Sequence, residues 1–131
     1  MNTGEPMGIR VVVIPGSVRP GNFTAHATAL VLDELRQEQV VVTVINPAEL
    51  DLPLPGLDRG SDGLPALRQA VTEATGVIFA TPEYHGSFSS VIKLVIENLG
   101  FPSVLAGKPV ALLGVAAGRI GAIKSLEHLR G

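Results

Sequence analysis

Residues 15–24 combine glycines with side chains that form hydrogen bonds. The glycines in this segment allow the main chain to approach a ligand closely. A helix that begins at its end would present unpaired N–H groups, which favour an anion. The segment also contains a permanent cation and three polar side chains, namely Arg19, Ser17, Asn22 and Thr24. We predict that it binds a phosphate ester, although an ordinary Gly/Pro turn with a capping Ser or Thr and an exposed arginine has the same local composition.

A second unusual segment, residues 81–90, brings an acid, an aromatic residue, a histidine and a glycine together. A flat heteroaromatic ring needs apolar surface against its faces and polar main-chain groups along its edge. Tyr84 and Phe88 offer the first, and a loop opened by Pro82 offers the second. We therefore predict that this segment holds such a ring. For the titratable residues we favour an exposed loop position for His85, and a conformational anchor or subunit contact for Glu83.

The motifs of several other chemistries are missing from the chain. The first segment matches neither G-x-G-x-x-G nor G-x-x-x-x-G-K-[ST], which argues against a dinucleotide fingerprint and an NTPase P-loop. No G-x-S-x-G elbow supports a Ser-His-acid triad. His26, His85 and His128 lack the spacing of metal ligands, and the chain has no cysteine. We expect no metal site and no catalytic side chain.

Short apolar runs alternate along the chain with longer segments of helical periodicity. The apolar runs predict strands over residues 10–14, 40–45, 76–80 and 109–115. The longer segments predict helices over residues 24–37, 64–74, 89–99 and 122–130. The connection over residues 46–63 is rich in proline and glycine, so we expect it to be irregular.

Two helix starts carry signals of their own. Thr24 is a plausible N-cap for the first helix, and Pro65 fits the first turn of the second. The apolar face predicted for the first helix consists of Ala27, Leu30, Val31 and Leu35.

A chain in which every strand is followed by a helix predicts a parallel sheet, because each crossover returns the chain to start again in the same direction. The expected fold class is α/β, with an open, doubly wound sheet. Ligands of such sheets lie beyond the carboxyl ends of the strands, where the strand order reverses. The loops after the first, third and fourth strands should therefore share one edge, and both unusual segments are among them.

Length and composition bound the remaining possibilities. The chain has 131 residues, of which 46% are hydrophobic and 17% charged, so we expect a single domain over residues 1–131 with a sizeable core. Its formal net charge of −2, without a basic stripe, gives no support for nucleic acid or an anionic membrane as partner. We expect residues 1–8 to form a flexible tail, because they lack the pattern of a signal peptide, and no apolar run reaches the length of a membrane span. We expect a cytoplasmic protein.

Three motifs resemble those of the NADPH-dependent FMN reductase family, a branch of the flavodoxin-like fold that includes quinone, azo and chromate reductases. Residues 16–24 resemble the phosphate loop of that family, and residues 82–87 together with Lys93 resemble its flavin-ring loop. Residues 114–122 resemble its third, glycine-bearing loop. The motifs occur in the right order and at the right spacing over nearly the whole chain. The resemblance implies a flavodoxin-like sheet of strand order 2-1-3-4.

The resemblance also assigns residues to the cofactor. It implies that the FMN phosphate is bound by the first loop and that the isoalloxazine ring is held by the second, largely through main-chain groups. Gly118 would leave room for the ring, and Arg119 would contact flavin or nicotinamide, unless it is a surface arginine at a helix start. The implied cofactor-binding residues are Ser17, Arg19, Asn22, Phe23, Thr24, Pro82, Glu83, Tyr84, His85, Gly86, Ser87, Gly118 and Arg119.

The sequence departs from the family pattern in three places. His85 stands where the family more often has asparagine, and Ser89-Ser90 stand where it often has Pro-Gly. Family members usually continue through a fifth strand and a final helix, whereas this chain stops at Gly131. We therefore expect a truncated C-terminus, with an exposed strand edge that a lost segment or another chain should cover.

By resemblance, the activity is transfer of hydride from NAD(P)H through bound FMN to a small acceptor such as a flavin, a quinone, an azo compound or a metal oxyanion. The flavin would carry the chemistry, and main-chain N–H groups would stabilise its reduced form. A flavodoxin that transfers single electrons is one alternative, disfavoured by Arg19 and the small net charge. A domain that has kept the fold and lost the flavin is another. Family analogy and the apolar helix at residues 91–99 suggest a homo-oligomer, either a dimer or a tetramer.

Overall fold

The computed structural model describes residues 8–57 and 63–131. Its strands are β1 (Arg10–Pro15), β2 (Val41–Val44), β3 (Gly76–Pro82) and β4 (Val110–Val115). Its helices are α1 (Phe23–Gln37), α2 (Gly63–Glu73), α3 (Ser90–Asn98) and α4 (Ile123–Arg130), with a short 3-10 helix, η1 (Pro47–Glu49). The tail predicted for residues 1–8 lies outside the described residues except for Gly8.

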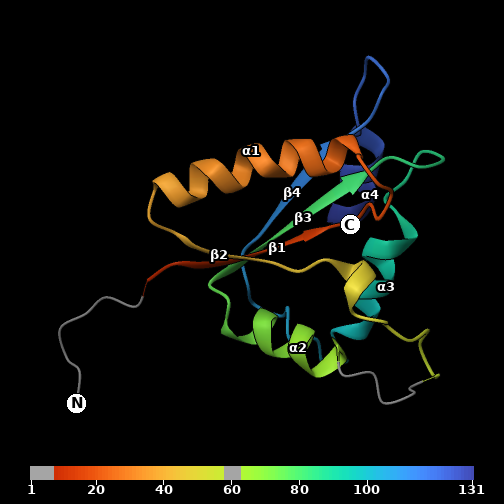
Figure 1. The fold of residues 1–131 in the computed structure, drawn as a ribbon. Coiled ribbons are helices and arrows are strands. Elements are labelled where there is room, and N and C mark those ends of the chain that lie inside the picture. Colours follow the sequence, from red (N-terminus) through yellow and green to blue (C-terminus); the bar gives the residue numbers. More distant parts are fainter. Residues whose placement is uncertain (1–7, 58–62) are drawn as a thin grey trace, which may run out of the picture.

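The four strands form one parallel sheet in the order β2-β1-β3-β4. Val12 of β1 stands opposite Thr43 of β2 and Val77 of β3, and Phe79 of β3 stands opposite Leu112 of β4. The predicted α/β fold class and the predicted strand order are confirmed. Because all four strands run the same way, their carboxyl ends lie at one edge of the sheet, toward which the arrowheads of Figure 1 point.

The two faces of the sheet are covered by different helices. Figure 1 shows α1 along one face and α2 and α3 against the other. Alternate residues of β1 and β3 pack with α2 and α3 in the main core, whose members include Val12, Ile14, Val77, Phe79, Leu67, Val71, Ile92 and Val95. Each such side chain contributes roughly 1.5–3 kcal/mol by leaving water. This core fixes the sheet under the loops that follow its strands.

Helix α1 differs from the sequence prediction at its start and along its buried face. Asn22, and not Thr24, is the N-cap, because its side chain accepts a hydrogen bond from the N–H of Ala25. The predicted core residue Leu30 is 75% exposed, whereas Thr24 and Thr28 are buried. Burial of Thr28 is tolerated because its hydroxyl donates to the Thr24 carbonyl at 2.7 Å. The α1 face that meets the sheet is thus partly polar, which the apolar pattern could not reveal.

Strand β3 is longer than predicted, because Thr81 and Pro82 continue the ladder opposite Gly114 and Val115 of β4. The loop predicted from residue 81 therefore begins at Glu83. Pro65 lies in the first turn of α2, as predicted. Within the described residues, no helix is long and apolar enough to cross a bilayer.

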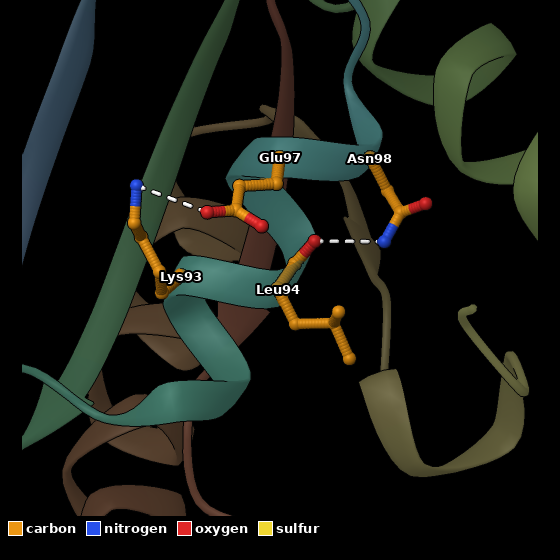
Figure 2. A network of polar contacts seen from close by, with 4 residues as sticks. All are labelled: Lys93, Leu94, Glu97 and Asn98. Atoms are coloured by element: carbon orange, nitrogen blue, oxygen red, sulfur yellow. Dashed lines mark hydrogen bonds and ion pairs between the residues drawn. The ribbon is translucent and has the colours of Figure 1, made fainter. Parts of the chain in front are cut away.

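The connection predicted to be irregular over residues 46–63 contains η1, and residues 58–62 of it lie outside the described residues. Asn98, at the end of α3, anchors this connection. Its side-chain amide donates to the carbonyls of Pro53 and Leu94, the second of which is drawn in Figure 2. Arg68 of α2 donates to the Asn98 carbonyl at 2.9 Å. These bonds tie α2, α3 and the connection together on one side of the sheet.

Candidate functional site

Three loops follow the carboxyl ends of β1, β3 and β4, and Figure 1 shows them at the same end of the sheet. We call residues 16–22 the first loop, residues 83–89 the second loop and residues 116–122 the third loop. The sequence-predicted site residues lie on these loops, except Pro82 at the end of β3 and Phe23 and Thr24 in the first turn of α1.

The first loop is closed by the side chain of Asn22. Its Oδ1 accepts a hydrogen bond from the N–H of Ala25 at 2.6 Å, and its Nδ2 donates to the Arg19 carbonyl at 2.6 Å. Both polar groups of this side chain are thus used within the chain. Asn22 therefore shapes the loop, and its predicted contact with a cofactor stays a prediction.

The main-chain N–H groups of residues 17–19 and 21–24 donate no hydrogen bond to any residue that the structure describes. They belong to the first loop and to the first turn of α1, where the helix dipole adds partial positive charge. Such a group of unpaired donors binds anions. Nearby, the Ser17 side chain is nearly buried and Arg19 is exposed. Donors and cation together suit a phosphate group.

Tyr84 connects the second loop to the first. Its hydroxyl lies 3.3 Å from Ser17 Oγ, and the Arg19 guanidinium carbon lies 5.0 Å from the centroid of its ring. The cation and the ring face therefore attract each other. Two of the predicted phosphate ligands and one of the predicted ring-binding residues are thereby brought together. Phe23, by contrast, is 74% exposed and packs edge-on against His26.

Gly16 is a glycine because of packing against α3. A Cβ at this position would overlap Ile92 and lie 2.8 Å from Ser89 Oγ. Its absence lets β1 end directly against the first turn of α3. The close approach that the sequence suggested for an anion is, at Gly16, an approach to a neighbouring helix.

The second loop contains a tight hairpin turn at His85 and Gly86. Tyr84 and Ser87 exchange two main-chain hydrogen bonds of 3.0 and 3.1 Å, and φ is +52° at His85 and +75° at Gly86. Positive φ at both central residues identifies a type I′ turn. Within the described chain the N–H groups of His85 and Gly86 have no partner, so they are available to a ligand. The His85 side chain is exposed, as predicted.

Buried hydroxyls close the base of the second loop. Thr81 Oγ1 accepts a hydrogen bond from the N–H of Ser89 at 3.1 Å and donates to the Pro82 carbonyl at 2.8 Å. Ser89 is the N-cap of α3, and its Oγ accepts from the N–H of Ile92. Sequence reasoning missed Thr81, although a threonine at the end of an apolar run was a signal that a buried hydroxyl serves the loop.

Helix α4 lies against the second loop. Ser125 N donates to Glu83 Oε2 at 3.2 Å, and Ser125 Oγ donates to the Pro82 carbonyl at 3.3 Å. His128 Nδ1 lies 3.1 Å from Ser87 Oγ. The contact of Glu83 with Ser125 is what a conformational anchor would form, and the subunit contact and the cofactor contact expected for Glu83 stay predictions. Ser125 was not singled out from the sequence.

The third loop is open around its glycines. Gly121 N donates to the Gly118 carbonyl at 3.0 Å, and a Cβ at either glycine would meet no heavy atom within 4 Å. Arg119 is exposed, and its side chain forms no ion pair or hydrogen bond with any residue in the described ranges. The loop thus leaves space at the edge shared with the other two loops.

Lys93, part of the second family motif, pairs with Glu97 at 3.2 Å, one turn further along α3 (Figure 2). Both side chains are partly exposed, so this pair contributes about 0.3–0.5 kcal/mol. Lys93 therefore has a local partner on α3. Across residues 8–57 and 63–131 no group of three His, Asp or Glu side chains is arranged to hold a metal ion.

The three loops together offer what a phosphorylated flat ring requires. The first loop has unpaired N–H donors beside Arg19 and Ser17, the second has free N–H groups in a rigid turn, and the third has open glycines. The donor set is neutral or cationic, apart from Glu83, whose carboxylate is engaged with α4. The chemistry of these residues fits FMN.

Comparisons with known proteins point the same way. The model of the NADPH-dependent FMN reductase family matches residues 9–131. A 2-hydroxy-1,4-benzoquinone reductase of Burkholderia is 33% identical over 135 residues, covering 95% of this chain and 70% of that protein. An NAD(P)H-dependent FMN reductase of Pseudomonas aeruginosa is 33% identical, and the match covers 93% of this chain and 68% of that protein. A quinone reductase of Escherichia coli is 34% identical, with the same coverage.

Solved structures of similar fold are flavoprotein reductases. The flavoenzyme NAD(P)H:acceptor oxidoreductase FerB from Paracoccus denitrificans aligns with a TM-score of 0.80 and 25% identity, covering 92% of this chain and 68% of that one. The apo form of an NADH:FMN oxidoreductase aligns with a TM-score of 0.73 and 25% identity, and the alignment covers 92% of this chain and 64% of that one.

Proposed function

The chain belongs to the NADPH-dependent FMN reductase family, whose members use FMN and NAD(P)H, and on that premise we propose that its three loops form the FMN site. The predicted family, enzyme class and cofactors agree with this membership. The proposal adds two things to this membership: the residues that bind FMN and the class of molecule that accepts the electrons.

One observation carries the proposal: the unpaired N–H groups of residues 17–19 and 21–24 beside Arg19. An ester phosphate carries close to two negative charges and is best held by several N–H donors and a guanidinium. In this proposal Ser17 and Arg19 exchange their contacts with Tyr84 for contacts with the phosphate. Thr24 contributes its N–H, and Asn22 keeps the loop in shape.

The ring of the cofactor is held by the second and third loops. The N–H groups of His85 and Gly86 have no partner among the described residues and can bind the polar edge of a flavin. Tyr84 adds apolar surface and Ser87 adds a hydroxyl, while Gly118 and Arg119 border the open side. Pro82 is buried at the end of β3 and supports the loop from below. The rigid turn matters because donors fixed in advance lose little entropy on binding.

FMN, when bound, supplies the redox chemistry by accepting a hydride from NAD(P)H and passing it to an acceptor. The protein binds and orients the cofactor, and its N–H donors favour negative charge at the ring edge. No side chain of the three loops is assigned as a nucleophile or general acid. The Glu83 carboxylate accepts a hydrogen bond from α4, and the His85 side chain is exposed.

The acceptor we propose is a small aromatic molecule, such as a quinone, an azo compound or a second flavin. The support is that similar proteins are named 2-hydroxy-1,4-benzoquinone reductase, quinone reductase and NADPH azoreductase. An acceptor that stacks on a flat ring needs the open space that the third loop leaves.

A titration of the purified chain with FMN, followed by turnover assays, tests the proposal. We expect FMN fluorescence to change saturably, and NADPH to be oxidised when benzoquinone is added to the loaded protein. Binding without NADPH oxidation would favour a flavodoxin-type carrier. No binding at all would leave a domain that has kept the fold and lost the flavin.

We also propose a homo-oligomer in the cytoplasm. The support for association is family analogy together with large apolar side chains that the fold leaves exposed, among them Phe101 and Ile120. Sedimentation velocity of the chain would contradict association if it gave only a monomer. Cell fractionation tests the location, and recovery of the chain in the membrane fraction or outside the cell would contradict it.

A further inference from the structure

Helix α4 uses one face to dock on the second loop. Its residue Ser125 is fully buried and contacts both Glu83 and Pro82. Three residues further along, His128 contacts Ser87. Residues three apart on a helix lie on the same side, so these contacts form a continuous face.

The N-terminus of α4 lacks a cap from its own sequence. Ala122 occupies the N-cap position and forms no side-chain hydrogen bond there. The first N–H groups of a helix have no partners within the helix, and an anion near them is favourable. The Glu83 carboxylate fills this role, because its Oε2 accepts from the N–H of Ser125 at 3.2 Å. Glu83 thus does for α4 from another element what Asn22 does for α1 from its own loop.

We infer that Glu83 is a positioning residue whose carboxylate fixes α4, and with it the third loop, against the second loop. The inference rests on the proposed function, because it concerns how two parts of the proposed FMN site are held at a set spacing. The third loop runs directly into the first turn of α4. A group that fixes this turn therefore fixes the end of the loop as well.

The packing of α4 against β4 agrees with this role. A Cβ on Gly114 of β4 would lie 2.7 Å from the Ala122 Cβ and 3.0 Å from Leu126. The helix is therefore packed tightly against β4, while Glu83 holds it from the second loop. With the third loop entering α4 between these two contacts, loss of the Glu83 contact should free the start of the helix before it disturbs the sheet.

Amide hydrogen exchange without cofactor tests the docking. We expect Glu83→Ala to raise exchange at Ser125 and in the first turn of α4 by about tenfold, and Glu83→Gln, which keeps an acceptor, by about threefold. Glu127→Ala is the matched control, because it removes an exposed carboxylate of the same helix. Exchange in β1 and β3 should stay unchanged in all three variants, which also verifies that they fold.

FMN titrations of the same variants test the positioning. We expect Glu83→Ala to weaken FMN binding by about tenfold, Glu83→Gln to restore most of the loss and Glu127→Ala to bind as the wild type does. Unchanged exchange at Ser125 in Glu83→Ala would overturn the docking. Raised exchange with wild-type FMN affinity would overturn the positioning role. A wild-type chain that binds no FMN would refute the proposed function itself. That result is distinguishable from failure of the positioning role, which is judged from the FMN affinities of the variants relative to the wild type.

Discussion

The first and second loops reach their shapes by different means. The first is closed by its own Asn22, which bonds to the Arg19 carbonyl and to the N–H of Ala25. The second is held by groups outside it, above all Thr81 at its base and Ser125 on α4. Within the described residues, the first loop leaves a set of N–H groups without partners, whereas Tyr84, Ser87 and Ser89 of the second loop donate theirs within the chain. A phosphate site can therefore be encoded in a few consecutive residues, while a ring site depends on the assembled fold.

The largest effect on stability should come from the point where the first loop meets α3. Gly16→Ala places a methyl group against Ile92 and Ser89, so we expect unfolding free energy to fall by roughly 2–3 kcal/mol. Gly118→Ala, at an open position, should change it by less than about 0.5 kcal/mol. Urea unfolding measures both. Equal stabilities of the Gly16→Ala and Gly118→Ala variants would mean that Ile92 and Ser89 can move aside to make room for the added methyl group.

The next effect concerns the cation of the first loop. Arg19→Ala should weaken FMN binding by about 2 kcal/mol, or roughly thirtyfold, because a charge-assisted contact to the phosphate is lost. Arg19→Lys should recover part of this, since it keeps the charge without the planar donor pair. Fluorescence titration gives both affinities. An Arg19→Ala variant that binds FMN as tightly as the wild type would remove Arg19 from the site.

The local closure of the first loop predicts a smaller change. Asn22→Ala should destabilise the chain by about 1 kcal/mol, the usual value of an N-cap. Asn22→Asp keeps the acceptor for the N–H of Ala25, so it should lower the free energy of unfolding by only a few tenths of a kcal/mol. Thermal unfolding distinguishes the pair. Equal losses in both variants would show that the bond to the Arg19 carbonyl, and not the cap, closes the loop.

The smallest effect is expected at the turn of the second loop. His85 adopts φ +52°, a conformation that asparagine tolerates better than most residues. His85→Asn should therefore stabilise the chain by roughly 0.5 kcal/mol and leave FMN affinity unchanged, because only the main chain of residue 85 serves the ligand. A loss of FMN affinity in calorimetric titration would instead assign the imidazole a direct contact.

Much of the fold could be predicted from the sequence, because strand and helix periodicity is local. The alternation of apolar runs and helical segments predicted a parallel sheet with three loops at one edge, and the family resemblance implied the observed strand order β2-β1-β3-β4. The sequence prediction is wrong at two points of α1. Asn22 and not Thr24 is the N-cap, through a local hydrogen bond that either residue type could form. Leu30 is exposed and Thr28 is buried, because packing against the sheet selects a partly polar face of the helix.

The candidate site could be predicted in part for the same reason. The first loop was recognisable from its own residues, and Arg19 and Ser17 do lie beside the second loop through Tyr84. Thr81 and Ser125 were missed, because their importance comes from partners 8 and 42 residues away in sequence. Small buried hydroxyls of this kind leave no periodic signal, so only the assembled structure identifies them.

The central claim is that the first loop binds the phosphate of FMN. Parallel titrations with FMN and riboflavin test it most directly, since the two ligands differ only in that phosphate. We predict that the wild-type chain binds FMN on the order of a hundredfold more tightly, and that Arg19→Ala narrows the ratio while riboflavin affinity stays the same. Equal affinity of the wild-type chain for both ligands would contradict the claim.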